Sequence, residues 1–415
     1  MMKHIYTSLD IGSDTIKIVV CELYQNKLNL LAASSFKSKG IKKGLITDVE
    51  LATESIKGAL SEVEEMLGIK IRKVIASIPS FNAEYSVIKG SIKINNEDGI
   101  VTSNDILKVL EVAVKSNPYT VREMITILPI DYTVDNQAFI KNPKGIKCSS
   151  LGCRAVLVTT PKKNVYSVIG LLENIGIEVV DISLNNIGDL YSFNNKLFED
   201  KIGAIINIGS DITDISLYNK SILVKSSIVN MGGKNIDNDI SYMYKVDIPT
   251  AKKLKLKFAL AHKKNASVND IIEVKSAIDA NLKINQFEIS EVVMSRLEEL
   301  LNETKKEINL LTSRKIDYII ITGGTSNMPG FEYVVRDVFG ENANIGNVKM
   351  LGIRDNIYSA CIGNIVYFIS KLKLKEQDYS MINDNEVYQM TSVNSKKLST
   401  SDSMLGKIFG YFFSE

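Results

Sequence analysis

The stretch SLDIGSDTIKIVVCEL at Ser8–Leu23 has a counterpart, AIINIGSDITDISLYN, at Ala204–Asn219. Both contain Ile-Gly-Ser-Asp after an apolar run and before an alternating run, and the two copies lie 197 residues apart. Solenoid repeats recur every few tens of residues, so this long spacing indicates another architecture. The sequence predicts two related lobes, each opening with the same strand–turn–strand unit.

Composition sets wide limits on the function of the chain. Its 415 residues are enough for two or more domains, and Lys plus Arg (50) nearly balance Asp plus Glu (48). The net charge of +2 gives no field that would favour a nucleic-acid partner. Four cysteines and two histidines lack metal-ligand spacing. Since neither a signal peptide nor a transmembrane run is evident, we expect an intracellular protein that is soluble for most of its length.

Local patterns predict how the chain is divided. Three strands at 6–12, 15–24 and 28–36 precede a helix at 48–67, which ends at Gly68. A separate α+β module follows, and its helix begins at a capping box of Thr102 and Asp105. A long helix at 290–314 precedes a buried strand, a glycine turn and another helix. The predicted units are a first lobe (1–83 and 159–200), an inserted subdomain (84–158), a second lobe (201–370, with 235–290 as its smaller subdomain), a linker (371–402) and a C-terminal helix (403–415).

The glycine turns predict a phosphate site. A strand that ends in Asp-Ile-Gly and turns back leaves backbone N–H groups pointing outward, and glycine allows a phosphate to approach them. Asp10 can hold Mg²⁺ through water, and Lys17 can face the same cleft. A single copy is more typical of an ordinary β-hairpin with a Gly-Ser turn. Two copies followed by ITGGTSNMPG at Ile321–Gly330, which suits a ribose and an adenine, favour one nucleotide between two lobes.

The order of these three loops resembles the superfamily of actin, heat-shock chaperone ATPases and sugar kinases. Within it the chain is similar to the FtsA family of bacterial cell-division actin homologues, which implies a two-lobed actin-like ATPase fold of the α/β class with an inserted α+β subdomain. The segments that carry the resemblance are GIKKGLITDVELATESI (40–56), LPIDYTVDNQAFIKNPKGI (128–146), MGGKNIDNDI (231–240) and SRLEELL (295–301). The stretch at 128–146 is the most discriminating, because other actin relatives place their extra subdomain elsewhere.

The resemblance also implies which residues bind ATP and Mg²⁺. Asp10, Gly12, Ser13 and Lys17 would serve the first phosphate site, and Gly209 and Asp214 the second. The adenosine site would use Gly323, Gly324 and Thr325, the ribose side Gly232 and Gly233, and the two flanks of the nucleoside Arg296 and Glu299. Candidate catalytic residues are Asp10, Asn207 and Asp214.

The second loop departs from the family pattern Asp-x-Gly-Gly-Gly-Thr-Thr-Asp. Asn207 stands in the place of a carboxylate that would organise Mg²⁺ or water, and Asp211 adds a negative charge near the phosphates. We therefore expect ATP binding with slow or absent hydrolysis. On this view, Asn207→Asp should raise turnover.

The resemblance implies a role and a set of partners. The chain would self-associate, tether FtsZ polymers to the cytoplasmic side of the cell membrane at the division site, and recruit later divisome proteins. The Lys-rich stretch KKLKLKFALAHKK at Lys252–Lys264 is a candidate contact for the C-terminal tail of FtsZ, or else a solvated helix face. Two alternatives are a pilus-assembly protein of the PilM kind and a sugar or carboxylate kinase, for which no substrate-facing base is evident.

The C-terminal tip SMLGKIFGYFFSE predicts a membrane anchor. Its apolar residues follow a helical spacing of i, i+3, i+4, i+7 and i+8: Leu405, Ile408, Phe409, Phe412 and Phe413. A helix of this length is too short to span a bilayer, so we expect it to lie in the interface. A helix packed on the protein's own core is the alternative, and the long polar linker before it argues against that.

Overall fold

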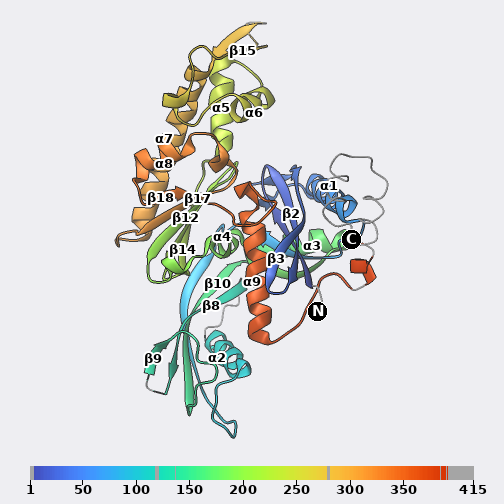
Figure 1. Cartoon of the computed structure of the whole chain (residues 1–415), viewed down its shortest axis with the longest axis vertical. Helices are drawn as coiled ribbons and strands as arrows, with labels where there is room; N and C mark the ends of the chain where they lie inside the picture. The colour runs from blue at the N-terminus through green and yellow to red at the C-terminus, as the bar shows by residue number, and fades with distance from the viewer. Residues whose placement is uncertain are drawn as a thin grey trace, which may run out of the picture.

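The computed structural model describes residues 4–116, 121–135, 137–277, 281–383, 385–388 and 390. The elements form two lobes, with one small subdomain extending from each (Figure 1). Three hydrophobic cores lie mainly in the first lobe, the second lobe and the subdomain at residues 84–161, and the first of them also takes in side chains from one face of the second lobe's sheet.

A mixed five-stranded sheet forms the first lobe, in the order β11-β6-β1-β2-β3. The strands are β1 (His4–Ile11), β2 (Thr15–Tyr24), β3 (Lys27–Lys37), β6 (Lys73–Ile78) and β11 (Glu178–Leu184). β1 pairs antiparallel with β2 and parallel with β6. Helices α1 (Val49–Leu67) and α3 (Lys162–Asn174) pack on this sheet. Asp48 caps the start of α1 and Gly68 ends it in the left-handed conformation, which confirms the predicted helix.

The second lobe repeats this sheet. Its order is β14-β13-β12-β17-β18, where β12 pairs antiparallel with β13 and parallel with β17. The strands are β12 (Ile202–Ile208), β13 (Thr213–Asn219), β14 (Ile222–Val229), β17 (Tyr318–Thr322) and β18 (Ala343–Ile345). β1 and β12 therefore hold the same central position, and the two Ile-Gly-Ser-Asp turns lie at equivalent ends of the two sheets.

The inserted subdomain leaves the first lobe after β6. It contains β7 (Glu84–Lys93), α2 (Ser103–Lys115), β8 (Arg122–Val134), β9 (Gln137–Ile140) and β10 (Ser150–Pro161), with strand order β7-β10-β8-β9. Thr102 and Asp105 form the predicted capping box at the start of α2. Ile106, Val109 and Leu110 of this helix enter the subdomain's own core.

A second subdomain extends from the other lobe. Its elements are α5 (Gly233–Tyr244), α6 (Ile248–Lys257), β15 (Ile271–Val274), β16 (Leu282–Asn285) and α7 (Gln286–Leu311), while α8 (Phe331–Phe339) packs against α7. The long helix predicted at 290–314 is present. It begins earlier than predicted because the side chain of Asn285 accepts a hydrogen bond from Glu288 N and caps it there.

Two helices in contact lie where the chain leaves the first lobe and where it returns to it. α4 (Asn185–Phe193) contacts α9 (Ser359–Lys375), and a Cβ at Gly188 would clash with Ala360 O. Only a residue without a side chain allows the helices to approach this closely. α9 contacts β1, β2 and β6 and enters the first lobe's core, so residues 359–370, which were predicted to be in the second lobe, pack on the first.

The linker predicted from residue 371 does not begin there. α9 continues to Lys375, and Met381 and Ile382 are buried against the first lobe. Met381 N also donates to Ile5 O at 2.9 Å, which ties this segment to β1. The remainder of the predicted linker lies largely outside the described residues, and the predicted tip (403–415) lies entirely outside them.

Candidate functional site

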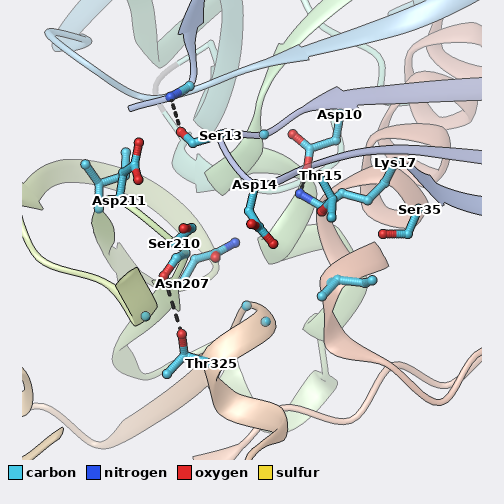
Figure 2. Close-up of a pocket in the computed structure, with 18 of the residues that line it drawn as sticks. Asp10, Ser13, Asp14, Thr15, Lys17, Ser35, Asn207, Ser210, Asp211 and Thr325 are labelled. Atoms are coloured by element: carbon cyan, nitrogen blue, oxygen red, sulfur yellow. Dashed lines mark hydrogen bonds and ion pairs between the residues drawn. The ribbon is translucent and has the colours of Figure 1, made fainter. Parts of the chain in front are cut away.

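A cavity of about 360 Å³ lies between the two lobes, a size suited to a small organic ligand. Most of the predicted site residues line it: Asp10, Gly12, Ser13, Lys17, Gly209, Asp214, Gly233, Gly323, Gly324 and Thr325. Figure 2 shows the two Ile-Gly-Ser-Asp turns and Thr325 around this space. The fold therefore brings together three loops that are about 100 to 300 residues apart in the sequence.

The first loop holds a buried ion pair. Asp10 at the end of β1 lies opposite Lys17 of β2, and Lys17 Nζ is 2.9 Å from Asp10 Oδ2. Burial disfavours the charge of Lys17, but the Asp10 carboxylate outweighs it and raises the pKa of Lys17. Asn185 Nδ2, at the start of α4, donates to the other Asp10 oxygen at 3.2 Å.

The turn of the first loop contacts a neighbouring hairpin. Gly44 N, between β4 (Ile41–Lys42) and β5 (Leu45–Ile46), donates to Ser13 Oγ at 2.8 Å. A Cβ at Gly12 would lie 2.6 Å from Lys17 Nζ and 2.7 Å from Thr15 O. Gly12 is therefore required for the close packing of this turn.

The second loop has a different charge arrangement. Asn207 at the end of β12 lies opposite Asp214 of β13, so an amide faces an acid. Ser80 of the first lobe donates to Asp214 Oδ2, and Ser216 donates to its Oδ1 at 3.0 Å. Burial raises the pKa of Asp214 to about 6, against the effect of these two hydroxyl donors.

The third loop connects to the second. Gly323 has a φ of +90°, and a Cβ there would lie 2.5 Å from Ile208 O, so both backbone conformation and space require glycine. Thr325 Oγ1, in the short helix Gly324–Asn327, donates to Gly209 O at 3.4 Å. Gly233 N donates to the same carbonyl at 2.9 Å, which ties α5 to this loop.

Three predicted residues do not line the cavity. Gly232 packs against the second loop, where Ser210 O would lie 2.5 Å from a Cβ at this position. Arg296 and Glu299 lie in a separate groove between α5 and α7, together with Asp239, Met243, Tyr244, Glu288, Glu291, Val292 and Ser295. Arg296 forms ion pairs there with Asp239 at 2.5 Å and with Glu299 at 2.6 Å. The structure does not bring these two residues to the cavity that the three loops line.

Two lysines of the cavity were missed by the sequence analysis. Lys252 and Lys255 of α6 both line it, and Lys252 Nζ lies 2.5 Å from Asp14 Oδ1 across the two lobes. Lys255 is buried, donates to Gly233 O at 2.7 Å and pairs with Asp237 at 2.7 Å. Lys252 and Lys255 are three residues apart and adjoin Ala251 and Leu254, which are buried. This helical spacing could have indicated that both lysines lie on the inward side of α6.

The Lys-rich stretch is therefore divided between two environments. Lys252 and Lys255 belong to the cavity, and Lys263 pairs with Glu291 at 2.6 Å. The exposed lysines of this stretch are Lys253, Lys257 and Lys264. The interpretation of the whole stretch as one partner surface was wrong for Lys252 and Lys255.

The oxygen atoms of the cavity suit Mg²⁺ that is bound mainly through phosphate and water. Asp10, Asn207 and Asp214 all line the cavity, and carboxylate and amide oxygens are ligands of the type that Mg²⁺ uses. Within the described part of the chain, no group of three or more His, Cys, Asp or Glu side chains could hold a metal ion. Magnesium commonly binds through one or two carboxylates, so these residues fit it.

None of the helices in the described ranges has the length and apolar character needed to cross a bilayer.

Comparison with protein families gives two matches. A model described as "Cell division protein FtsA" matches residues 204–363, which include the second and third loops. A model described as "SHS2 domain inserted in FTSA" matches residues 82–159, which coincide with the inserted subdomain.

Curated relatives extend this similarity over most of the chain. The Cell division protein FtsA of Enterococcus hirae is 26% identical over 390 residues, which cover 94% of this chain and 85% of that protein. The Cell division protein FtsA of Bacillus subtilis (strain 168) is 26% identical over 395 residues, covering 94% and 89%.

Solved structures share the two-lobed fold. The PilM-PilN type IV pilus biogenesis complex matches with a TM-score of 0.59 and 14% identity, covering 87% of this chain and 98% of that chain. MreB5 of Spiroplasma citri bound to ADP matches with a TM-score of 0.54 and 15% identity, covering 90% and 99%. At these identities the likeness shows the fold alone, which is that of the actin-like ATPases.

The two family models together match more than half of the 415 residues, and the chain belongs to the FtsA family of cell-division proteins.

Proposed function

We propose that this chain binds ATP between its lobes and uses the bound state to tether FtsZ polymers to the membrane during cell division. The observation that carries the proposal is the meeting of three glycine loops and the lysines Lys17, Lys252 and Lys255 around one cavity. Glycine backbones and lysine ammonium groups are the common means of holding phosphate. A structural neighbour of the same fold, MreB5 of Spiroplasma citri, is bound to ADP.

Three parts of the cavity would share the nucleotide. The first loop and Lys17 would hold the terminal phosphates, Gly209 and Asp214 the second phosphate site, and Gly323–Thr325 the adenosine. Asp10 and the amide oxygen of Asn207 would hold Mg²⁺ through water, and the ion would screen the phosphate charge when bound. Hydrolysis would be slow, because Asn207 supplies no charge at the end of β12.

The membrane contact in this proposal is the tip at residues 403–415. Leu405, Ile408, Phe409, Phe412 and Phe413 would enter the interface, while Lys407 alone would attract anionic lipid. One such helix binds weakly, so firm attachment would depend on several joined copies of the chain. Self-association would then couple membrane attachment to ATP, and the chain would act on the cytoplasmic side of the cell membrane at the division site, where later divisome proteins are recruited.

The exposed lysines of the second lobe are the proposed contact for the acidic C-terminal tail of FtsZ. Lys253, Lys257 and Lys264 are exposed and can contact a partner, whereas Lys252 and Lys255 line the cavity. The groove beside Arg296 is a weaker alternative: it has the apolar side chains of Met243 and Val292, but four acids also line it and two of them already pair with Arg296. Charge reversal distinguishes the two binding positions. The triple variant Lys253→Glu, Lys257→Glu and Lys264→Glu should weaken binding of the tail peptide. If only Arg296→Glu weakened it, the groove would be the better candidate.

Recruitment of FtsZ to lipid vesicles tests the proposed function as a whole. The full chain with ATP and Mg²⁺ should carry FtsZ polymers to vesicles that contain anionic lipid. Removal of 404–415 should abolish this recruitment and leave ATP affinity, measured by isothermal titration, unchanged. Phe409→Glu should act in the same way, with Leu310→Glu as a control because Leu310 is an exposed apolar residue elsewhere. Recruitment by the truncated chain at the level of the full chain would exclude the tip as the anchor.

A further inference from the structure

One helix supplies polar partners to both phosphate loops. Asn185 and Asp189 lie four residues apart on α4, on the same face of the helix. Asn185 Nδ2 donates to Asp10 in the first lobe at 3.2 Å. Asp189 Oδ2 accepts from Asn207 Nδ2 in the second lobe at 2.7 Å. The first loop therefore carries the acid and α4 the amide, whereas in the second loop these roles are exchanged.

Asp189 is held firmly beneath the cavity. Its side chain is buried, and Ser359 Oγ donates to its second oxygen at 2.6 Å. Thr322 Oγ1 lies 3.1 Å from Ser359 Oγ, which extends the network to the end of β17. The close crossing of α4 and α9 at Gly188 fixes the separation of Asp189 and Ser359. Asp189 does not itself line the cavity.

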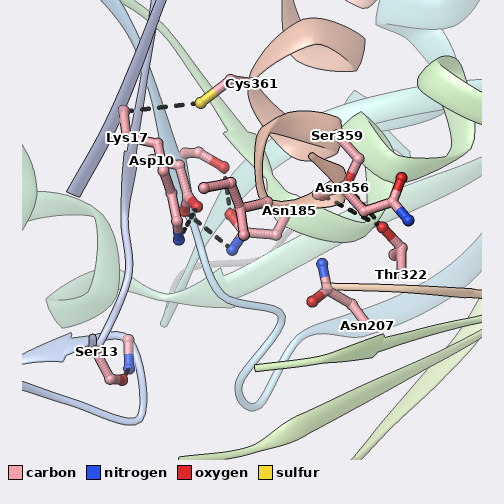
Figure 3. A network of polar contacts seen from close by, with 12 residues as sticks. Asp10, Ser13, Lys17, Asn185, Asn207, Thr322, Asn356, Ser359 and Cys361 are labelled. Carbon is pink, nitrogen blue, oxygen red and sulfur yellow. Dashed lines mark hydrogen bonds and ion pairs between the residues drawn. The ribbon is translucent and has the colours of Figure 1, made fainter. Parts of the chain in front are cut away.

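This contact determines which atom of Asn207 a ligand meets. A carboxylate accepts hydrogen bonds, so the Asn207 side chain must turn its nitrogen to Asp189. In Figure 3 this nitrogen points toward the side on which Ser359 lies, and the amide oxygen points away from it. Asn207 lines the cavity, and no donor to its oxygen is found among the described residues. The oxygen is thus the group left for a ligand or for a water molecule bound to it.

We propose that Asp189 is a positioning residue that orients the Asn207 amide, so that the pair presents a hydrogen-bond acceptor where the family pattern places a carboxylate. The inference rests on the proposed ATP site and concerns how that site receives Mg²⁺ and its water.

Because the acid of this pair is on α4 and the amide is on the second loop, we no longer expect Asn207→Asp to improve the site. With Asp189 in place, an acid at 207 would put two carboxylates at the 2.7 Å contact, and one of them would have to take up a proton. The single variant should therefore not gain Mg²⁺ affinity. The double variant Asp189→Asn with Asn207→Asp restores one acid and one amide, in the arrangement that Asp10 and Asn185 already have.

A ligand-free measurement tests the orientation directly. In the full chain labelled with ¹⁵N-asparagine, the Asn207 side-chain signal is identified by its loss in Asn207→Asp. The proton that Asn207 Nδ2 donates to Asp189 should exchange slowly with water in the wild type. In Asp189→Leu, where the side chain has a similar size but no acceptor, the Asn207 nitrogen loses this partner, so exchange should become fast. Unchanged slow exchange in Asp189→Leu would overturn the inference.

A titration with ATP, in the presence and absence of Mg²⁺, tests the consequence. The gain in ATP affinity that Mg²⁺ gives should fall roughly fivefold to tenfold in Asp189→Leu, the usual scale for one lost hydrogen bond. The double variant should recover it. Asp181→Leu is the matched control, because Asp181 is also largely buried but pairs with Lys371 outside the cavity.

The possible outcomes separate the two proposals. A merely structural role would lower ATP affinity equally with and without Mg²⁺, and the double variant would not recover the gain. Absence of ATP binding by the wild type would reject the proposed function, while the exchange measurement would still decide the orientation of Asn207.

Discussion

In the first lobe Asp10 faces Lys17 across the hairpin, whereas in the second lobe Asn207 faces Asp214 at the same position. The backbones are equivalent, but the first pair is neutral as a whole and the second carries one acid without a cation in its own hairpin. The cations near the second loop come from other elements: Lys234 of α5 lies 3.8 Å from Asp211, and Lys255 of α6 lines the same cavity. The duplicated backbone thus determines where the two loops lie. Their side chains differ in charge, so we expect the two loops to contribute differently to ligand binding.

Replacing Gly12 and Gly209, which hold the same position in the two turns, should show the difference between the two loops most clearly. A Cβ at Gly12 would lie 2.6 Å from Lys17 Nζ and 2.7 Å from Thr15 O, but one at Gly209 would meet only Ile212 O at 3.0 Å. Gly12→Val should therefore weaken ATP binding by roughly 100-fold or more, a loss within reach of the usual cost of overpacking. Gly209→Val should cost clearly less. Isothermal titration measures both, with thermal unfolding as the check on folding, and equal losses would contradict the comparison.

Part of the dependence of stability on pH should come from two acids around the second loop. Burial raises the pKa of Asp189 to about 7 and that of Asp214 to about 6, above the value of about 4 for an unfolded chain. The folded state then binds more protons than the unfolded state between about pH 4 and pH 7. Stability from these groups is therefore greatest at low pH and is lost as the pH rises, by up to about 2 kcal/mol per group between pH 5 and pH 7.

Thermal unfolding at a series of pH values measures this loss. Asp189→Asn should reduce the slope between pH 5 and pH 7, whatever its effect on stability at one pH. Lys17→Met with Asp10→Asn, the corresponding change in the first loop, provides the comparison. An unaltered slope in Asp189→Asn would mean that its carboxylate has no raised pKa.

Removing the acids at the loop tips should have the smallest effects. Asp14 pairs with Lys252, and Asp211 accepts a hydrogen bond from Lys43 N at 3.1 Å and lies 3.8 Å from Lys234. Both acids compete with phosphate for these cations, but the Asp14 pair is partly exposed, so each is worth at most about 1 kcal/mol. Asp14→Ser and Asp211→Gly should each tighten ATP binding about threefold at low salt. Weaker binding in both variants would show that the acids support the loops instead of opposing the phosphate.

Local sequence signals were enough to predict the elements that carry the loops. The strands around Asp10 and Asn207 have apolar runs that end at glycine turns, and α1 has a cap at each end. These signals lie within a few residues of the features that they predict. The family resemblance supplied the order of the loops and the inserted subdomain.

The roles of the residues that the sequence did not reveal depend on packing between distant segments. Asp189 is four residues from Asn185 in sequence, but its role appears only when β12 lies beside α4. Lys252 and Lys255 belong to a run of lysines, and only the position of α6 directs these two to the cavity. Arg296 was placed by resemblance alone, and the fold directs it to the groove between α5 and α7. A pattern within one segment holds no information on which other segment it will face.

The return of α9 to the first lobe determines how the two lobes are connected. The chain passes to the second lobe after α4 and comes back just before α9, so two covalent crossings join the lobes, and both lie beside the contact of these helices. A body attached at two points can rotate easily only about the line through them. We therefore expect the close contact of Gly188 with α9 to act as the pivot if the cleft opens. Asp189, one residue from the pivot, would move little, while Asp14 and Lys252, which lie across the cleft from each other, would separate most.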